Sequence, residues 1–441
     1  MQLIEKVFKA GVVGAGGAGF PTHVKLQAKV DVIVANGAEC EPLLATDRRV
    51  MAQYAQEIVD GMRLVMETTG AKEGIIGVKE KYEDALHAFG TALSGVNNIK
   101  IHLLGNFYPA GDEFVLVQET TGRIIPEGGL PLNVGVVVNN VNTLRNIYRA
   151  YNDIPVTHQV VTVNGEVKIP MVLDVPIGMA IGDLIDICEG TTVDDYIVIV
   201  GGPMMGRLTK NLNEPITKTT TGIIVLPSDH SYVMRKSRTV EEEIRWSQSQ
   251  CDQCRDCTEF CPRWLQGHAL EPHKVMRVMD YNLDTSPHAK TITSSFLCSE
   301  CGVCDIFSCP MNLSPRVMFK ELKQRLMQEG LKNPHSNAPK EGRSLAEYRK
   351  VPKDRLIQRL DMAKYDCYPE LAKEELVASQ VRIPLRQHIG VPARPLVHFG
   401  DMVHKGDLIG AVEQNQLGAN IHASITGKVV DVANDHITIK A

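Results

Sequence analysis

Two short cysteine runs constrain the fold and chemistry of this chain more than any other feature. The first run, C-x2-C-x2-C-x3-C-P, contains Cys251, Cys254, Cys257 and Cys261. The second run, C-x2-C-x2-C-x4-C-P, contains Cys298, Cys301, Cys304 and Cys309. The first spacing is the one that many bacterial proteins use to hold a [4Fe–4S] cluster. Two such runs predict two clusters in one module and a role in moving single electrons.

The fourth cysteine of each run is expected to bind the cluster of the other run. Three thiolates spaced two residues apart can come from one tight loop, but that loop cannot close on itself to provide the fourth. In proteins with two such clusters the fourth cysteine crosses over. The expected ligand sets are therefore Cys251, Cys254, Cys257 with Cys309, and Cys298, Cys301, Cys304 with Cys261.

Structural zinc and disulfide bonds are the two alternatives for these cysteines. Zinc sites usually use separated C-x2-C pairs or mixtures of cysteine and histidine, whereas each run here has three cysteines within seven residues. A disulfide framework suits a small secreted domain, and this sequence has 441 residues and no recognisable secretory signal. Cys188 and Cys367 stand alone and are assigned no role.

Length and composition indicate a multidomain protein of the cytoplasm. At 441 residues, the chain is too long for one ordinary core. A net charge of −5 and an aromatic content of 5% argue against a nucleic-acid partner. No apolar stretch approaches the roughly 18 residues that a membrane span requires. We therefore expect a cytoplasmic protein that does not span a membrane.

The predicted fold class is multidomain α/β, and residues 1–152 form the first predicted domain. Short β-branched runs at residues 31–35, 74–78 and 135–138 alternate with helical periodicity at residues 47–69 and 81–93. Alternating strands and helices favour a largely parallel sheet that helices cover on both faces.

Four further segments follow. Residues 153–232 predict a β-grasp module, with strands at 160–163, 167–172 and 196–200, a two-residue turn at Asn164-Gly165 and a helix at 181–188. Residues 233–335 predict a helical two-cluster domain, with helices at 240–249, 272–281 and 315–329. Residues 336–378 are interpreted as a linker that carries a helix or two. Residues 379–441 predict a β barrel-sandwich, because 400–409 and 421–429 resemble the half-motifs of lipoyl and biotinyl domains. The tip between these halves has no lysine, so no swinging arm is expected.

A glycine-dense loop within VGAGGAGFPTHVK, residues 13–25, is a candidate anion site. Glycine lets backbone N–H groups approach a phosphate without a Cβ in the way. The spacing G-x-G-x-x-G matches the dinucleotide fingerprint, but the following Phe-Pro leaves room only for a short helix ending near Lys29. A flexible loop is the alternative. The candidate ligand-binding residues are Gly14, Gly16, Gly17, Gly19 and Lys25.

Two polar segments are expected to join this loop at one crevice. Each follows an apolar strand, as the glycine loop is also expected to do, and ligands of parallel sheets bind at the carboxyl ends of strands. An asparagine taken alone is more often a turn residue or a helix cap, so the convergence of three segments is what favours a site. The candidates are Asn36, Glu39 and Glu41 in the first segment, and Asn139, Asn140 and Asn142 in the second.

These motifs carry a family resemblance. GAGGAGFPTHVK, NGAECEP with Asp47-Arg48, and NNVNTL resemble the FMN- and NADH-binding subunit of respiratory complex I and, more closely, the C subunit of Rnf electron-transport complexes. The paired cysteine runs match the Rnf subunit, whose barrel-sandwich segment lies at the N-terminus rather than the C-terminus. The order found here resembles soluble members such as the cobalamin reductases of propanediol-utilisation microcompartments and a proline-reductase-associated electron-transfer protein.

The resemblance implies a flavin domain, a β-grasp (SLBB) domain and an iron–sulfur domain, in that order. It implies that the glycine loop and Lys25 hold FMN and that NADH stacks over the flavin. It also implies that the polar candidates belong to the flavin or nucleotide site and that residues 108–113 lie near the nucleotide. The protein would be an NADH-dependent oxidoreductase that passes electrons through FMN and two [4Fe–4S] clusters, without an acid–base triad. The acceptor would be a corrinoid or a redox partner protein, in the cytoplasm, in a microcompartment or at a membrane complex.

Two further hypotheses stay open. The chain could be a non-catalytic subunit, of Rnf-like or proline-reductase type, that relays electrons between partner proteins; in that case it would bind no nicotinamide itself. It could also be a structural or redox-sensing protein with zinc in the cysteine sites. No corrinoid-binding motif is present in the sequence, so a corrinoid acceptor rests on the resemblance alone.

Overall fold

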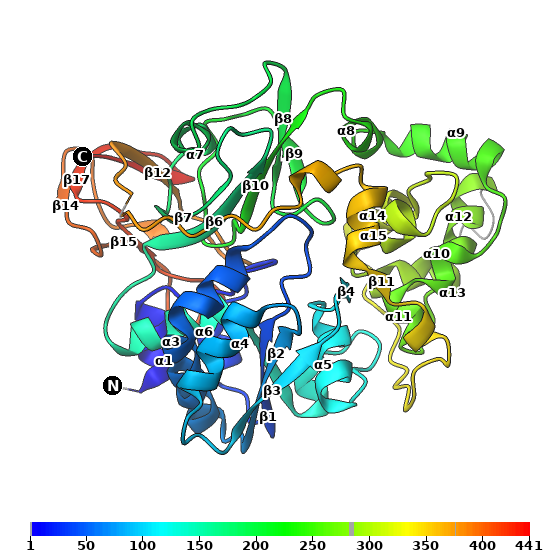
Figure 1. The fold of residues 1–441 in the computed structure, drawn as a ribbon, viewed down its shortest axis with the longest axis horizontal. Coiled ribbons are helices and arrows are strands. Elements are labelled where there is room, and N and C mark those ends of the chain that lie inside the picture. The colour runs from blue at the N-terminus through cyan, green and yellow to red at the C-terminus, as the bar shows by residue number, and fades with distance from the viewer. Residues whose placement is uncertain (1, 282–285, 375) are drawn as a thin grey trace.

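The computed structural model of the chain describes residues 2–281, 286–374 and 376–441. Figure 1 shows an α/β unit at the N-terminus (blue to cyan), a β unit above it (green), a helical unit to one side and a second β unit at the C-terminus (orange to red) on the other side. A strap from the helical unit crosses back past the first two units to reach the C-terminal unit. Among the described residues, no helix is both long enough and apolar enough to cross a bilayer.

A four-stranded parallel sheet forms the first unit, as predicted. Its strand order is β3 (Ile99–Leu104), β2 (Glu73–Lys79), β1 (Val32–Gly37) and β5 (Val136–Asn140). One core lies between the sheet and helices α3 (Thr46–Thr69), α4 (Glu83–Ala92) and α6 (Val141–Tyr151). The other core lies between the sheet and α5 (Glu113–Thr121), because successive strand residues point to opposite faces. The predicted strands and helices of this unit are confirmed to within two residues.

The second unit is a mixed sheet with one helix, which confirms the β-grasp prediction. The sheet order is β7 (Met171–Pro176), β6 (His158–Gly165), β10 (Gly222–Pro227), β8 (Tyr196–Val200) and β9 (Arg207–Thr209). The central pair, β6 and β10, is parallel, and the other pairs are antiparallel. Helix α7 (Ile181–Ile187) contributes Ile181, Leu184 and Ile185 to the main core.

The predicted two-residue turn at Asn164-Gly165 is wrong, as is the start of the strand after it. β6 continues through Gly165, and β7 begins five residues later than a two-residue turn would allow. Asn164 is buried, and its side-chain amide donates to the carbonyl oxygens of Leu43 and Tyr365, both at 3.1 Å. Gly165 lies against the backbone of Val225, where a Cβ has no space. The Asn-Gly pair therefore serves long-range contacts that local turn preferences do not encode.

The cysteine runs lie in the helical unit. Its long helices are α9 (Val240–Gln250), α12 (Pro272–Tyr281) and α14 (Pro315–Gln328), each within one residue of its predicted bounds. A reciprocal pair of hydrogen bonds between Thr239 and Glu242 caps the N-terminus of α9. The helical unit also contains the short helices α8 (Ser231–Lys236), α10 (Asp256–Glu259), α11 (Pro262–Leu265) and α13 (Lys290–Thr293). Two other short helices, α1 (Leu3–Lys9) and α2 (Thr22–Lys25), lie near the N-terminus.

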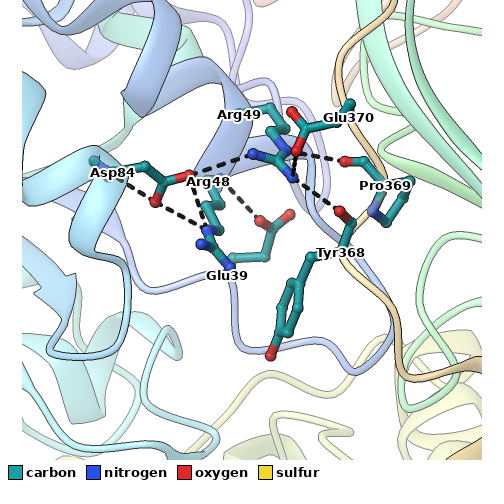
Figure 2. A network of polar contacts seen from close by, with 8 residues as sticks. Glu39, Arg48, Arg49, Asp84, Tyr368, Pro369 and Glu370 are labelled. Atoms are coloured by element: carbon teal, nitrogen blue, oxygen red, sulfur yellow. Dashed lines mark hydrogen bonds and ion pairs between the residues drawn. The ribbon is translucent and has the colours of Figure 1, made fainter.

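The segment expected to be a linker, residues 336–378, packs against the first unit. Its strand β11 (Val351–Pro352) pairs with β4 (Phe107–Tyr108), and α15 (Lys353–Arg359) follows at once. Figure 2 shows the next contact: Arg49 at the start of α3 donates to the carbonyl oxygens of Tyr368 at 2.8 Å and Pro369 at 2.9 Å. Residues 368–369 of this strap thus accept hydrogen bonds from α3.

The C-terminal unit consists of two small sheets packed together, which confirms a barrel-sandwich. One sheet has the order β12 (Gln380–Pro384), β18 (His436–Lys440), β17 (Gly427–Val432) and β14 (Met402–Val403). The other has the order β13 (Arg394–Pro395), β15 (Leu408–Ala411) and β16 (Ile421–His422). Its buried side chains, such as Val381, Ile409 and Ile439, join the main core of the first two units.

Candidate functional site

The glycine loop, residues Gly14–Gly19, closes on itself beside the carboxyl end of β5. Gly14 N–H donates to the carbonyl oxygen of Phe20 at 3.0 Å, and Ala15 N–H donates to Thr143 Oγ1 in α6 at 2.9 Å. The expectation that a strand precedes this loop is wrong, because Val13 forms only an isolated bridge with Pro21. The short helix α2 follows, so the loop differs from a Rossmann turn, which has a firm strand before it and a long helix after it.

Asparagines at the ends of β1 and β5 lie near this loop, and we call the region that they share with the loop the crevice, after the sequence prediction. Asn36 Nδ2 donates to the carbonyl oxygen of Gly111 at 2.9 Å, and Asn140 Nδ2 donates to Asp47 Oδ2 at 3.0 Å. Lys25 Nζ donates to the carbonyl oxygen of Val138 at 2.8 Å. Three segments that are far apart in the sequence therefore converge, as predicted, at the carboxyl ends of two parallel strands.

Polar atoms and backbone space of these segments are free for a ligand to use. Among the described residues, Asn139 Nδ2 and Asn142 Oδ1 are buried without a hydrogen-bond partner, a state that is costly unless something bound satisfies them. A Cβ on Gly17 would meet nothing within 4 Å, and one on Gly16 would meet only Asn140 Nδ2, at 3.9 Å. This combination fits a planar, multiply hydrogen-bonding, phosphorylated ligand such as FMN.

Glu39 serves the architecture of the crevice. Its carboxylate accepts the N–H groups of Asp47 and Arg48, each at 2.9 Å, at the N-terminus of α3. Burial raises the pKa of Glu39, although these two hydrogen bonds oppose the shift. Burial, with the nearby Glu39 charge, also raises the pKa of Asp47. The Glu39 carboxylate is thus committed to the helix terminus and cannot reach a ligand without leaving it.

The backbone carbonyl of Glu39 is held from both sides by buried lysines. Lys79 Nζ from β2 donates to it at 3.3 Å, and Lys353 Nζ from the strap donates to it at 3.4 Å. Both lysines are almost fully buried, and burial lowers the pKa of each. Glu39 itself has a left-handed backbone conformation, with φ of 35°, which costs about 1–2 kcal/mol in a residue with a side chain. Nothing in the sequence signals that Lys353 reaches this position.

Glu41 points away from the crevice. Its carboxylate accepts the N–H groups of Met204 and Met205, each at 2.9 Å, in the loop between β8 and β9. The carbonyl oxygen of Met204 in turn accepts a hydrogen bond from Arg316 of the helical unit. Of the six polar candidates, Glu41 is therefore the one that the structure separates from the glycine loop and joins to the cysteine-bearing unit.

The eight cysteines gather around two cavities in the crossed-over grouping predicted from their spacing. We name the two groups the outer set, which consists of Cys251, Cys254, Cys257 and Cys309, and the inner set, which consists of Cys261, Cys298, Cys301 and Cys304. Each set lines one cavity. The outer cavity is also lined by Arg255 and Arg277, and the inner cavity by Arg263 and Arg316.

The two cysteine loops share one backbone conformation. Gln253 and Arg255 have φ of 57° and 71°, and the corresponding Glu300 and Gly302 have φ of 60° and 79°. Left-handed residues curl a loop so that its N–H groups face inward. Glu300 N–H donates to Cys298 Sγ at 3.3 Å, and Leu313 N–H donates to Cys309 Sγ at 3.3 Å.

Sulfurs that converge and accept N–H hydrogen bonds are the donor set that an iron–sulfur cluster requires. Burial raises the pKa of Cys261 and of Cys301 to about 12. Without a metal these groups stay protonated thiols, because a cation is needed to stabilise so many buried thiolates.

The loop of residues 108–113 joins the crevice to the inner set. Gly111 of this loop accepts the hydrogen bond from Asn36, while Tyr108 Oη donates to the carbonyl oxygen of Cys301 at 2.7 Å. Arg263, two residues after Cys261, pairs with Asp112. Sequence reasoning missed Arg263 and Arg316; the position of Arg263 directly after Cys-Pro was the one available signal.

Four stretches of the chain match domains of known families. Residues 7–149 match the Nuo51 FMN-binding domain, 160–208 the SLBB domain, 250–314 the 4Fe-4S dicluster domain, and 366–441 the RnfC barrel sandwich hybrid domain. This order confirms the multidomain architecture predicted from the sequence.

Known proteins match over long stretches. The cobalamin reductase PduS of Citrobacter freundii is 42% identical over 441 residues, which cover 99% of this chain and 95% of that protein. A component of the Na(+)-translocating ferredoxin:NAD(+) oxidoreductase complex of Acetobacterium woodii is 36% identical over 266 residues, 59% of this chain and 57% of that protein. A chain of the NAD+-reducing [NiFe]-hydrogenase in its air-oxidized state shares the fold, with a TM-score of 0.50 and 20% identity over 84% of this chain and 67% of that chain.

Proposed function

This chain belongs to the family of the cobalamin reductase PduS, and from that premise we propose that it passes electrons from NADH through FMN and two [4Fe–4S] clusters to a corrinoid. An FMN-binding domain and a [4Fe–4S] dicluster domain in one chain make it an electron-transfer oxidoreductase. The electron donor, the number of clusters and the acceptor are the proposed parts.

One observation carries the proposal: the crevice and the inner cysteine set share the 108–113 loop. Asn36 is hydrogen-bonded to Gly111 on one side of this loop, and Cys301 accepts from Tyr108 on the other. A redox group in the crevice and a cluster in the inner set would therefore be separated by a few residues of packed protein.

The crevice residues would bind and orient FMN. The glycine loop and Lys25 suit its phosphate, because backbone N–H groups and an ammonium both favour an anion there. The unpartnered Asn139 Nδ2 and Asn142 Oδ1 would meet polar edges of the ligand. When bound, FMN supplies the exchange between two-electron donors and one-electron acceptors. The candidate residues are Gly14, Gly16, Gly17, Gly19, Lys25, Asn36, Asn139, Asn140 and Asn142, with Glu39 and Asp47 as support.

The outer and inner sets would each hold one [4Fe–4S] cluster, which accepts and releases one electron at a time when bound. The N–H groups that face the sulfurs stabilise thiolate charge and set the reduction potential. Pro262 follows Cys261 and begins α11, and Pro262 and Arg263 line the inner cavity beside this remote ligand.

The corrinoid acceptor and a setting in a bacterial microcompartment rest on the kinship with PduS. The matched region extends over 95% of the Citrobacter protein. The unmatched part of that relative is therefore too small to be a cofactor-binding module. The RnfC relatives supply a second candidate function, a protein that relays electrons between protein partners, because one of them is 36% identical over 266 residues, which cover 59% of this chain.

Anaerobic reduction tests the proposal. Reconstituted protein mixed with NADH should lose its flavin absorbance, and added aquacobalamin should then be reduced at two equivalents per NADH, since each corrinoid takes one electron. Lys25→Gln should lose extractable FMN, whereas the neighbouring control Lys29→Gln, whose Nζ donates to the Thr68 carbonyl oxygen at the surface, should keep it.

Each hypothesis has its own outcome. Flavin that stays oxidised with NADH but accepts electrons from a reduced ferredoxin would support the relay function. Zinc without acid-labile sulfide would remove electron transfer altogether.

A further inference from the structure

We propose that Lys218 of the second unit and Gln387 of the C-terminal unit are positioning residues, which hold the glycine loop in the shape that selects a flavin phosphate. This role rests on the proposed binding of FMN at the loop. It goes further, because it gives a part in the flavin site to two units that contribute none of the candidate ligands.

The glycine loop presents backbone donors that the protein itself does not use. Among the described residues, none accepts a hydrogen bond from the N–H groups of Gly16, Gly17 or Ala18. Gly17 and Gly19 have φ of 66° and 68°, and left-handed residues turn successive N–H groups toward one side of a loop. These donors can therefore meet an anion together, provided that the loop keeps this shape.

The loop has little internal structure that would keep this shape. Four of the six residues from 14 to 19 are glycines, and glycine loses more backbone freedom on ordering than any other residue. One backbone hydrogen bond, from Gly14 N–H to the carbonyl oxygen of Phe20 at 3.0 Å, closes the loop. Contacts from outside must supply the remaining order, because a site that is ordered only when its ligand arrives loses affinity.

Lys218 fixes the chain just before the loop. Its Nζ donates to the carbonyl oxygens of Gly11 and Asn420, each at 2.7 Å, and Lys218 is 2% exposed. Gly11 has φ of 67°, and a Cβ there would have no room beside the Asn420 carbonyl oxygen. One buried ammonium thus joins the first, second and C-terminal units three residues before Gly14.

Gln387 fixes the end of the loop. Its Oε1 accepts the backbone N–H of Lys218 at 2.9 Å, which ties the two residues together. A Cβ on Gly19 would lie 2.7 Å from Thr219 Cγ2 and 3.1 Å from the carbonyl oxygen of Gln387. Gly19 therefore packs against the same two segments that hold Gly11, so both ends of the loop depend on them.

This arrangement predicts an effect on the phosphate that differs from general stability. The phosphate of FMN would meet the loop, whereas the ring system would meet the polar side chains at the ends of β1 and β5. Loss of the support behind the loop should therefore weaken binding of FMN. Riboflavin, which has the same ring system and no phosphate, should bind as before.

Flavin titrations of deflavinated protein test this role. The wild type should bind FMN more tightly than riboflavin. Lys218→Met should lower the affinity for FMN about tenfold or more and that for riboflavin less than about twofold. Gln387→Leu should shift the FMN-to-riboflavin ratio in the same direction, and it keeps the test open if Lys218→Met does not fold.

Ser424→Ala is the matched control. Ser424 is buried in the C-terminal unit, and its Oγ donates to the carbonyl oxygen of Ile177 in the second unit. Within the part of the chain that the structure describes, neither residue is hydrogen-bonded to the glycine loop. This variant should lower the melting temperature and leave the FMN-to-riboflavin ratio unchanged.

Hydrogen exchange of the deflavinated protein gives a second readout that needs no ligand. The N–H groups of Gly14 and Ala15 are hydrogen-bonded, at 3.0 and 2.9 Å. Lys218→Met should speed exchange in a peptide that covers residues 11–20, because the loop is then released from behind. Ser424→Ala should leave exchange in this peptide unchanged.

The outcomes separate this role from the proposed function. A wild type that binds FMN no more tightly than riboflavin would remove the phosphate from the loop, and the proposed flavin site would fail with it. A wild type that prefers FMN, with the same preference in Lys218→Met and Gln387→Leu, would overturn only the role of these two residues. An equal loss of preference in Ser424→Ala would also overturn it, because the effect would then come from general loosening of the units.

Discussion

Arg263 donates from Nη1 and Nη2 to the two carboxylate oxygens of Asp112, at 2.7 and 3.0 Å. Arg263 lines the inner cavity, and Asp112 caps α5 through the N–H groups of Phe114 and Val115. The side chains are 8% and 13% exposed. One buried ion pair thus fixes the helical unit to the loop that borders the crevice.

Arg263→Gln should destabilise this contact, because it leaves the Asp112 charge buried and unpaired. The expected cost is about 3 kcal/mol of unfolding free energy, measured as a lower urea midpoint for the transition that involves the helical unit. The double variant with Asp112→Asn should recover part of the loss. Arg343→Gln, an exposed arginine whose Nε donates to the carbonyl oxygen of Trp264, is the matched control and should cost little.

Iron content of paired cysteine variants should reveal the crossed-over ligand sets. Cys309→Ala should halve the iron from about eight to about four atoms per chain, and adding Cys251→Ala should remove no more, because both residues belong to the outer set. Adding Cys261→Ala instead should remove the rest. If Cys309→Ala and Cys298→Ala together left half of the iron, the second run would hold one cluster by itself.

Two glycines of the same loop should respond differently to valine. Gly16→Val places a side chain in open space beside Asn140 Nδ2, so FMN content should fall while the melting temperature stays unchanged. Gly19 has φ of 68°, and its Cβ would lie 2.7 Å from Thr219 Cγ2 and 3.1 Å from the carbonyl oxygen of Gln387. Gly19→Val should therefore lower the melting temperature by disturbing the contact with the second and C-terminal units. Equal loss of FMN and stability in both variants would contradict this division.

Glu41→Ala should weaken the contact between the first and second units and leave the flavin in place. The variant removes the acceptor for the N–H groups of Met204 and Met205, and leaving the donor of the buried Met204 unsatisfied costs about 1–3 kcal/mol. The check is unfolding by urea beside FMN extraction. Loss of FMN with unchanged stability would instead return Glu41 to the nucleotide site.

Lys218 should make stability rise with pH above neutrality. It is buried, donates to the carbonyl oxygens of Gly11 and Asn420, both at 2.7 Å, and burial lowers its pKa to about 7. Because the unfolded value is about 10.4, the unfolded chain binds more protons than the native one between these two pKa values. The contribution of this group to the unfolding free energy therefore increases over that window.

The matching variant is Lys218→Met, which has no titratable group. The melting temperature of the wild type relative to Lys218→Met should increase from pH 7 to pH 9. Parallel pH profiles of the two proteins would rule out Lys218 as the source. His388 and His422, whose pKa values burial lowers to about 4 and about 3, stay neutral over this range and do not interfere.

Much of the fold could be predicted because its signals are local. The periodicity of residues 47–69 and the β-branched runs at 31–35 and 74–78 identified α3, β1 and β2, since amphipathic faces repeat along short stretches of chain. The cysteine spacing predicted the grouping into two sets because a curled loop can offer three sulfurs to only one cavity. The polar residues at the ends of β1 and β5 indicated the crevice, because ligands of parallel sheets bind at the carboxyl ends of strands.

Long-range contacts explain the wrong turn prediction and the packing of the segment expected to be a linker. Asn164-Gly165 has a strong local turn preference, yet Asn164 is used to hold Leu43 and Tyr365. Residues 336–378 have the composition of a linker, but Lys353 is buried against the Glu39 carbonyl oxygen. A polar side chain gives the same signal in the sequence whether its partner is water or a residue three hundred positions away.

The sequence by itself determined the order of the domains, the chemistry of the cysteines and their division into two sets, because spacing and periodicity act within a few turns of chain. Only the tertiary structure decided that the inner set faces the crevice, that Glu41 serves the interface and that Cys254 reaches the surface. These features depend on how the folded units pack against one another. Such packing depends on the complementarity of surfaces that many segments build together, so no single segment encodes it.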